Sequence, residues 1–278
     1  FVLEAVARAL RPVPRLTVSE WADRYRILPS KASAEPGPWR TARTPYLREI
    51  MDALSVHSTV EKVVFMKGAQ IGATEAGNNW VGYTIHHAPG PMLYIEPSLE
   101  LARRASKIRI APMISDSPVL AALVSEVKAS HSENTILAKE FPGGTLVLTG
   151  ANSAAGLRHQ SARNLFADEV DGYPHDVGGE GDPLSLAVKR TETFSGIRKV
   201  FVVSTPTVKG LSRIETEFEE TDKRYYEVPC PFCGAFQRIV WAQIRWPEGK
   251  PEDAHLVCAD CAAEIDEGHK GKMLAAGR

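Results

Sequence analysis

The sequence lacks any apolar run of the roughly 18 to 20 residues that a membrane-spanning helix requires, so a soluble globular protein with no membrane association is expected. It also lacks the uncharged core of a signal peptide. Its first residues, FVLEAVARALRPVPRL, instead predict a short amphipathic helix ended by prolines. We therefore expect an intracellular protein.

Neither sign of charge dominates. The 33 lysines and arginines nearly balance the 34 aspartates and glutamates, which gives a net charge of −1. This balance argues against a globally basic nucleic-acid-binding protein, although a local basic patch is compatible with it. Cysteine is also scarce, and all four cysteines lie after Tyr225. With 278 residues, 44% of them hydrophobic, the chain is long enough for one sizeable core and a small appendage.

Five apolar, β-rich runs alternate with helical patterns, as is typical of parallel α/β folds. The predicted strands are Val60–Lys67, Pro91–Pro97, Gly144–Ala151, Asn164–Asp171 and Lys199–Pro206. The predicted helices are Thr74–His86, Ser98–Ile110, Pro118–Lys128 and Pro183–Thr193. Several strands lack polar alternation, which indicates a mostly parallel sheet flanked by helices on both faces. The stretch ENTILAKEFPGGTLVL predicts an antiparallel hairpin at one edge of that sheet.

The stretch FMKGAQIGATEA resembles a phosphate-binding loop (Walker A) without its standard lysine. The pattern G-x-x-x-x-G-K-[ST] places lysine seventh, but with Thr74 as the last residue Ala73 takes that position and Lys67 stands first. Lys67 could still reach phosphates across the turn, because its four-carbon stem is flexible. An ordinary glycine-containing turn is the alternative. The predicted phosphate loop consists of Lys67, Gly68, Ala69, Gln70, Ile71, Gly72, Ala73 and Thr74.

Two acids end a later apolar run, NLFADEVD, as in a Walker B strand. A parallel strand delivers its last residues to the sheet edge where ligands bind. There Asp168, with the Thr74 hydroxyl, would hold Mg²⁺, and Glu169 would orient and polarise an attacking water. An ordinary acidic loop is the alternative reading of the acids alone. Together with Lys67, their order and spacing predict a nucleoside triphosphatase of the P-loop (RecA/ASCE-like) class.

The next predicted strand ends in VVSTPT. Ser204 and Thr205 could sense the γ-phosphate and pass its loss to a segment that grips DNA. A Ser/Thr-rich turn before Pro206 would look the same.

The four cysteines form two C-x2-C pairs, Cys230 with Cys233 and Cys258 with Cys261. Each pair can deliver two thiolates from one tight turn, and four thiolates close a tetrahedral structural zinc site. Two disulfides are the alternative, which a reducing cytosol disfavours. We expect the intervening FQRIVWAQIRW to supply strands of a zinc ribbon, which is too small to hold a core without metal. The sequence alone predicts that chelation unfolds this module while the rest of the chain keeps much of its ATP affinity.

Taken together, these motifs resemble the GpA-type large terminase subunit of tailed bacteriophages. The resemblance rests on ILPSKASAEPGPWRTARTPYLREIMDAL, KGAQIGAT, GLRHQSARNLFADEVDGYP, STPT and VPCPFCG, in that order, and covers nearly the whole chain. It implies an ATPase motor that drives double-stranded DNA into a preformed capsid, with lysine at the start of a deviant phosphate loop. It further implies the small terminase subunit, the procapsid portal and a homo-oligomeric ring as partners, in the host cell cytoplasm.

Three parts are expected along the chain. Residues 1–57 would form a helical and extended segment bordering the nucleotide site, residues 58–224 the ATPase core, and residues 225–278 the zinc module. Members of the family also carry a C-terminal metal-dependent nuclease. Nothing after Ala262 offers a strand-borne acidic cluster, so we expect the nuclease to be absent from this chain.

Further side chains have a functional and an ordinary interpretation. Arg158 is our candidate for an arginine that reaches the γ-phosphate, ahead of Arg163 or a surface salt bridge. Trp39, with Pro45 and Tyr46, lies upstream of the loop, where related motors place adenine, but packing residues would look alike. Arg103, Arg104, Lys107 and Arg109 could form a solvated helix face or contact DNA phosphates.

Three functions therefore compete. The first is a DNA-packaging ATPase and the second is another nucleic-acid translocase, such as a helicase of related fold. The third is a zinc-ribbon binding module on an inactive nucleotide-binding core. The presence of both Asp168 and Glu169 argues against the third.

Overall fold

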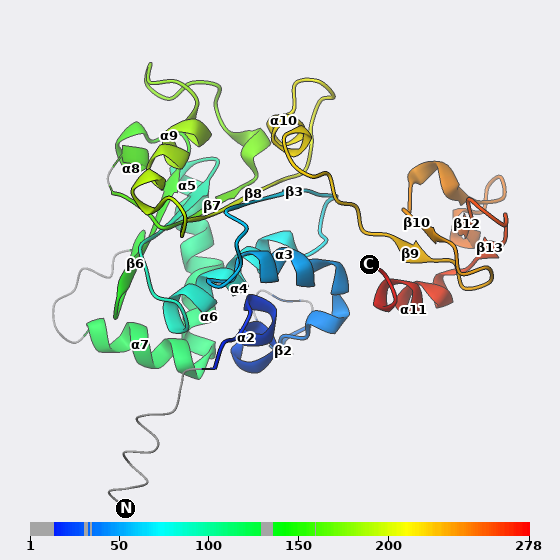
Figure 1. The fold of residues 1–278 in the computed structure, drawn as a ribbon, viewed down its shortest axis with the longest axis horizontal. Helices are drawn as coiled ribbons and strands as arrows, with labels where there is room; N and C mark the ends of the chain where they lie inside the picture. The colour runs from blue at the N-terminus through cyan, green and yellow to red at the C-terminus, as the bar shows by residue number, and fades with distance from the viewer. Residues whose placement is uncertain (1–13, 31–32, 34, 129–135, 159) are drawn as a thin grey trace, which may run out of the picture.

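A computed structural model describes residues 14–30, 33, 35–128, 136–158 and 160–278 (Figure 1). The amphipathic helix predicted for the first sixteen residues lies almost wholly outside them. Within the described residues, no helix is long and apolar enough to cross a membrane.

A six-stranded sheet forms the centre of the larger part of the molecule. Its order is β3-β8-β7-β4-β6-β5. The strands are β3 (Lys62–Met66), β4 (Met92–Glu96), β5 (Ala138–Phe141), β6 (Gly144–Gly150), β7 (Asn164–Asp168) and β8 (Lys199–Ser204). All neighbours pair in parallel except β5 and β6, which pair antiparallel. The mostly parallel sheet and the edge hairpin predicted from sequence are thus confirmed.

The helices of the described residues include the four predicted from sequence and several that were not predicted. They are α2 (Val18–Tyr25), α3 (Arg48–Ala53), α4 (Ala73–His86), α5 (Leu99–Ala105), α6 (Ala111–Asp116), α7 (Pro118–Lys128), α8 (Ala154–Arg158), α9 (Pro183–Lys189), α10 (Arg213–Glu219) and α11 (Lys270–Ala275). The helix predicted for Ser98–Ile110 begins where expected, but it is not one continuous α-helix. A π-helical segment, η3 (Ser106–Ile110), follows α5, and α6 continues the run. The helix predicted to reach Thr193 is four residues too long, because α9 ends at Lys189.

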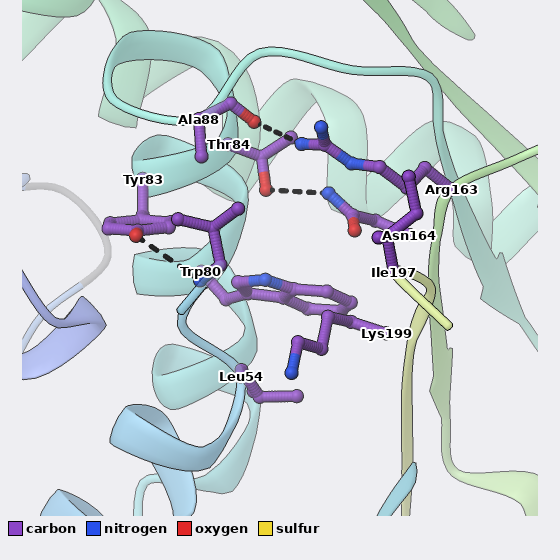
Figure 2. Close-up of a pocket in the computed structure, with 10 residues that line it drawn as sticks. Leu54, Trp80, Tyr83, Thr84, Ala88, Arg163, Asn164, Ile197 and Lys199 are labelled. Carbon is purple, nitrogen blue, oxygen red and sulfur yellow. Dashed lines mark hydrogen bonds between the residues drawn. The ribbon is translucent and has the colours of Figure 1, made fainter. Parts of the chain in front are cut away.

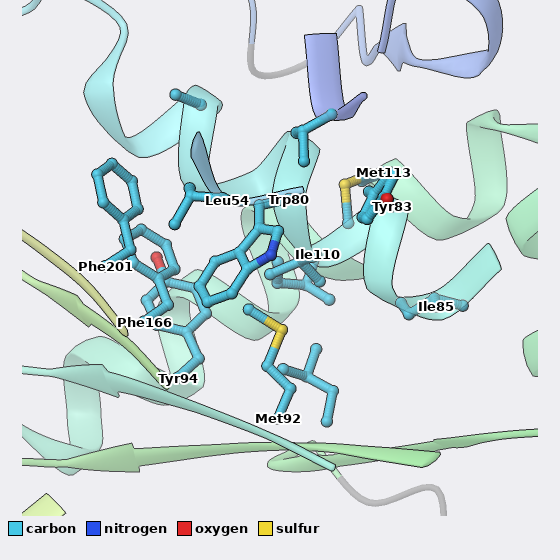
Figure 3. Close-up of a cluster of buried hydrophobic side chains, with 14 of the residues drawn as sticks. Leu54, Trp80, Tyr83, Ile85, Met92, Tyr94, Ile110, Met113, Phe166 and Phe201 are labelled. Atoms are coloured by element: carbon cyan, nitrogen blue, oxygen red, sulfur yellow. The ribbon is translucent and has the colours of Figure 1, made fainter. Parts of the chain in front are cut away.

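Alternating strand residues build two cores, one on each face of the sheet. Tyr94, Phe166 and Phe201 stack across neighbouring strands, with ring centroids 4.4 and 5.4 Å apart, and face α4 (Figure 3). Close approach is possible because α4 carries Gly77, where a Cβ atom would lie 2.1 Å from the Phe166 ring. Leu165 and the other buried residues on the opposite face of the sheet pack against α8, α9 and α10. Burial on both faces explains why the strands read as continuous apolar runs.

The N-terminal segment packs on the α4 side of the sheet. Thr17 caps α2 in a reciprocal capping box with Glu20, and the amide of Val18 donates to Ser55 Oγ at 2.9 Å. The Trp21 ring lies against Gly82 of α4, where a Cβ would approach it to 2.2 Å. Helix α2 was not predicted, although Thr17 and Glu20 carry the capping-box pattern.

The C-terminal module, residues 225–278, lies to one side of the sheet with α11 toward the N-terminal segment (Figure 1). It holds two small antiparallel sheets. These are β9 (Val228–Pro229) with β10 (Phe236–Gln237), and β11 (Ile244–Arg245), β12 (His255–Val257) and β13 (Glu264–Ile265). Only Phe236–Gln237 and Ile244–Arg245 of the predicted FQRIVWAQIRW strand region form strands. Its middle forms a 3₁₀ turn at Trp241–Gln243, which leaves the Trp241 side chain exposed.

Candidate functional site

Three neighbouring strands bring the predicted site residues to one edge of the sheet. The predicted phosphate loop, residues 67–74, which keeps that name below, joins the end of β3 to the start of α4, and β8 lies between β3 and β7. The amide of Lys67 donates to the Ser204 carbonyl at 3.1 Å, which fixes the start of the loop to the end of β8. The residues predicted at the ends of these three strands therefore meet.

Lys67 lies at the centre of this group. Its Nζ donates to Glu169 Oε1 at 2.7 Å and to Thr205 Oγ1 at 2.8 Å. The Lys67 side chain is only 7% exposed, whereas that of Glu169 is 43% exposed. A nearly buried ammonium that faces an accessible carboxylate presents one positive and one negative group to the same space. We call Lys67, Thr74, Asp168, Glu169 and Thr205 the lysine–acid cluster.

Thr74 and Asp168 form the second half of the cluster. Thr74 Oγ1, in the first turn of α4, donates to Asp168 Oδ2 at 2.9 Å. Asp168 is almost fully buried, and burial raises the pKa of its carboxyl to about 6, while the Thr74 hydrogen bond opposes that rise. A hydroxyl and a carboxylate are hard oxygen donors of the kind that Mg²⁺ prefers. Their chemistry fits the predicted magnesium site.

The backbone is strained on both sides of the cluster. Gln70 in the phosphate loop has φ of 56° and Glu169 has φ of 51°, values that non-glycine residues rarely adopt. Gly72 has φ of 84° and lies under Leu47, whose Cδ1 would be 3.2 Å from an added Cβ. Such strain persists where surrounding structure fixes it, often at functional sites.

Ser204 and Thr205 contact the Glu169 carboxylate directly. The Thr205 amide donates to Glu169 Oε2 at 3.4 Å, and Ser204 Oγ donates to the same oxygen at 3.5 Å. Asp171, three residues after Asp168, accepts from the Thr207 amide at 2.9 Å and from the Ile214 amide at 2.8 Å. The end of β7 is therefore tied to the segment that follows β8.

Glu96 is a buried acid that the sequence analysis missed. It ends β4 beside the end of β7, is 6% exposed, and accepts a hydrogen bond from the Tyr94 hydroxyl at 3.0 Å. Burial, reinforced by the charge of Asp168, raises the pKa of Glu96 to about 8. The run PMLYIEP carried the same signal as NLFADEVD, an acid at the carboxyl end of an apolar strand.

Two arginines near the cluster were also not singled out for this position. Arg109 projects from η3, and charge interactions with Tyr94, Glu96 and Asp168 outweigh burial and raise the pKa of its guanidinium. Arg109 is exposed, as are Arg103 and Arg104. Arg26, 2% exposed, donates to Glu75 Oε2 at 2.8 Å and so links the end of α2 to the first turn of α4.

The remaining predicted residues lie elsewhere or are otherwise engaged. In the described structure, Arg158 contacts the Ala154 carbonyl and pairs with Glu180 at 3.0 Å, and its side chain is 54% exposed. Trp39 is buried in the α4-side core, where its indole donates to Thr41 Oγ1. The Tyr46 hydroxyl donates to the Ile71 carbonyl in the phosphate loop at 3.1 Å. Tyr46 thus contacts residues 67–74, and its predicted role at adenine stays a prediction.

The four cysteine sulfurs of the C-terminal module converge. All lie within 4.8 Å of one another, and all four cysteines are free thiols. Cys230 Sγ is 3.9 Å from Cys261 Sγ, and Cys233 Sγ is 3.8 Å from Cys258 Sγ. Four thiolates around zinc at about 2.3 Å would be about 3.8 Å apart, so the arrangement fits that metal. Backbone N–H groups of Cys261 and Asp260 lower the pKa of the Cys258 thiol, whereas the pKa values of the Cys233 and Cys261 thiols are raised by burial and by neighbouring thiols.

Two hollows in the described structure lie apart from the cluster's own side chains. The first, about 10 Å³, is at the opposite, N-terminal edge of the sheet and is lined by Trp80, Asn164 and Lys199 among others (Figure 2). It has room for a single water at most. The second, about 440 Å³, is lined by residues including Asp171, Tyr173 and Arg213.

The fold and the cluster define the class to which this chain belongs: α/β proteins whose mostly parallel sheet gathers polar residues at the carboxyl ends of its strands. Within that class, the model of the family described as "Phage terminase large subunit gpA, ATPase domain" matches residues 33–278, so the chain belongs to this family.

Two curated relatives agree with this assignment. The chain is 31% identical over 256 residues to a protein named "Terminase, large subunit" from Enterobacteria phage P21, covering 89% of this chain and 39% of that protein. It is 29% identical over 273 residues to the protein of the same name from Escherichia phage lambda, covering 95% of this chain and 42% of that protein. The chain thus spans about two fifths of the length of these relatives.

A solved structure, the "Thermus Phage P74-26 Large Terminase ATPase domain", is also similar. It aligns with a TM-score of 0.39 and 15% identity over 58% of this chain and 65% of that chain.

Proposed function

We propose that the chain binds and hydrolyses ATP at the lysine–acid cluster and is the motor part of a viral DNA-packaging enzyme. The observation that carries the proposal is the meeting of Lys67, Thr74, Asp168 and Glu169 at one sheet edge, with Lys67 Nζ 2.7 Å from Glu169 and Thr74 Oγ1 2.9 Å from Asp168. Membership in an ATPase-domain family supports it.

Each group has a role in phosphoryl transfer. Lys67 would neutralise phosphate charge from the start of the loop, while backbone amides of residues 68–74 and the α4 N-terminus cradle the phosphates. Thr74 and Asp168 would hold Mg²⁺, which supplies charge neutralisation on the phosphate oxygens. Because Lys67 now pairs with Glu169, a phosphate that bound Lys67 would compete with that carboxylate and free it to act on water.

Ser204 and Thr205, at the end of β8, would respond to this release of the Glu169 carboxylate. Ser204 and Thr205 both bond the Glu169 carboxylate, so a movement of Glu169 alters their contacts directly. Thr207 and Asp171 would carry the change to α10, whose first turn Asp171 caps through the Ile214 amide. We propose that this route couples hydrolysis to the grip on double-stranded DNA.

The remaining roles follow the family. We propose that the motor works as a homo-oligomeric ring on the procapsid portal with the small terminase subunit, in the host cytoplasm. Arg158 remains our candidate for the arginine that reaches the γ-phosphate, from its own subunit or a neighbour. For that, it would have to leave its exposed pair with Glu180. The cysteine cluster would bind a structural Zn²⁺ in a zinc ribbon.

The deciding experiment is ATP hydrolysis by this chain with and without duplex DNA. We expect DNA-stimulated turnover, and Glu169→Gln should keep ATP binding but abolish turnover, because an amide fills the same space without the charge. An unwinding assay separates the two motor functions, since a packaging motor moves duplex DNA without parting its strands. Nucleotide binding without turnover in the unmodified chain would favour an inactive binding module instead.

A further inference from the structure

The C-terminal module contacts the phosphate loop through one short element of the N-terminal segment. This element is the 3₁₀ turn η2 (Pro45–Leu47). It reaches the loop at two successive residues, because the Tyr46 hydroxyl donates to the Ile71 carbonyl and Leu47 packs over Gly72. Leu47 is fully buried, so η2 is fixed against the loop rather than resting on its surface.

Tyr226 contacts the opposite side of η2. Its ring meets the Tyr46 ring edge to face, with centroids 5.9 Å apart and an interplanar angle of 71°. Aromatic pairs in this geometry attract one another beyond simple burial. This pair of rings joins the module to the residue that holds Ile71, beside helix α11, which also contacts η2.

Tyr226 is itself held rigidly by the module. Its hydroxyl donates to the Leu274 carbonyl in α11 at 2.6 Å, and its ring lies so close to Gly277 that an added Cβ would be 2.4 Å away. Glu227 exchanges backbone hydrogen bonds with Arg278 at 2.9 Å, and Cys230 follows only four residues after Tyr226. The position of this ring is thus set by the folded module and by the turn that bears the first cysteine.

We propose that Tyr226 is a positioning residue for the nucleotide site. Through Tyr46 and Leu47 it holds the backbone of Ile71 and Gly72 in the conformation that receives phosphate. The C-terminal module thereby sets the affinity of the loop for nucleotide. The predicted change in nucleotide affinity rests on the proposed ATPase function. The predicted change in the loop's conformation does not, because it needs no ligand.

The first test measures amide hydrogen exchange of residues 67–76 without nucleotide in four proteins: the unmodified chain, Tyr226→Ala, Tyr226→Phe and Trp241→Ala. Tyr226→Ala should speed exchange of the loop about fivefold, the change expected when one ordinary contact is lost. Tyr226→Phe loses the bond to Leu274 but keeps the ring, which still packs on Tyr46 and Gly277, and should stay close to the unmodified rate. Trp241→Ala removes an exposed ring of the same module that lies against Trp246, and should leave the loop unchanged.

The second test measures the Kd of a non-hydrolysable ATP analogue in Tyr226→Ala, Tyr46→Phe and the double variant. Each single change should weaken binding about fivefold, and the double variant should be no weaker than the worse single one, because both act on the same bond to Ile71. Additive losses would overturn the route through Tyr46.

Unchanged exchange of residues 67–76 in Tyr226→Ala would overturn the proposal. The same result would overturn it if the amides of residues 225–278 exchanged faster, because an opened module would then leave the loop unaffected. If the unmodified chain bound no nucleotide, the proposed function would fail, while the exchange experiment would still decide whether the module positions the loop.

Discussion

At the scale of single residues, Lys67 serves both as the centre of the cluster and as the residue that departs from the usual phosphate-loop pattern. It stands at the first position of the loop rather than the seventh. Its buried side chain nevertheless reaches Glu169 and Thr205, which come from two other strands. We propose that a lysine at the loop's start serves the space that the usual lysine serves from its end.

Lys67→Ala should weaken ATP binding and turnover together, because phosphate charge loses its partner in both the ground and transition states. A charge-assisted hydrogen bond contributes about 1.5 to 3 kcal/mol, so we expect at least a tenfold rise in the Kd for ATP, measured by titration calorimetry. Lys62→Ala is the matched control, since Lys62 lies at the other end of β3 and pairs with Glu217. Equal ATP affinity in Lys67→Ala and the unmodified chain would contradict the displaced-lysine interpretation.

Glu96 predicts a pH dependence of stability. Its pKa is raised from 4.5 to about 8 in the folded protein, so the folded state binds this proton more tightly than the unfolded chain does. The contribution of Glu96 to the free energy of unfolding is therefore largest below about pH 4.5. It falls as pH rises toward 8 and is constant above that.

Glu96→Gln should remove this loss, because the amide cannot ionise yet can still accept from Tyr94. Relative to the unmodified chain, the variant should gain about 3 to 5 kcal/mol in free energy of unfolding between pH 5 and pH 9, measured by urea denaturation. Glu248→Gln, at an exposed position, is the control. A difference that stays constant across this pH range would show that Glu96 is already ionised at pH 5.

At the scale of elements, α4 links the site to the core. Its first turn carries Thr74, and its middle packs on the aromatic ladder of β4, β7 and β8 (Figure 3). Because Gly77 admits the Phe166 ring, the helix lies close enough to the sheet for Thr74 to bond Asp168. Packing at Gly77 and geometry at Thr74 are therefore connected through one rigid helix.

Gly77→Ala should destabilise the fold, since its Cβ would lie 2.1 Å from the Phe166 ring within a filled core. Overpacking of this kind costs about 1 to 3 kcal/mol, which exceeds the gain of up to about 1 kcal/mol from replacing a helical glycine. Thermal and urea unfolding measure the change. Gly271→Ala in α11, which has no atoms near the added Cβ, should instead leave stability equal or higher. A stable Gly77→Ala protein would mean that α4 can move away from the sheet.

At the scale of the whole molecule, the cysteine module contacts the N-terminal segment beside the predicted nucleotide site. Sequence spacing alone separates them, because every predicted phosphate-binding residue precedes Pro206. The folded chain brings Tyr226 of the module against Tyr46, which bonds the loop. Metal binding in the module should therefore influence nucleotide affinity as well as local folding.

The purified protein should hold one Zn²⁺ per chain by elemental analysis. Removal of the metal should unfold the segment after Tyr225, because apparent zinc affinities in small modules correspond to about 10 to 16 kcal/mol at neutral pH. Cys233→Ser should have the same effect without a chelator. We further expect ATP affinity to fall several-fold rather than vanish, since the lysine–acid cluster itself lies in the sheet. A metal-free protein with full structure would remove the zinc assignment.

The sequence by itself determined much of what is local. Apolar runs, a glycine-bearing loop and paired cysteines are read from neighbouring residues, and side-chain periodicity follows directly from helix and strand geometry. These features correctly predicted the parallel strands, the edge hairpin and the start of α4. The capping box at Thr17 and the acid at Glu96 are equally visible in the sequence, but neither was predicted from it.

Only the tertiary structure decided which distant residues meet. The placement of β8 between β3 and β7 brings Lys67 to Glu169, 102 positions away, and to Thr205, 138 positions away. The hydrogen bond of Thr74 to Asp168 and the contact of Tyr226 with Tyr46 depend likewise on packing between segments far apart in the chain. Such contacts are fixed by how whole faces bury against one another, and no short stretch of sequence contains that information.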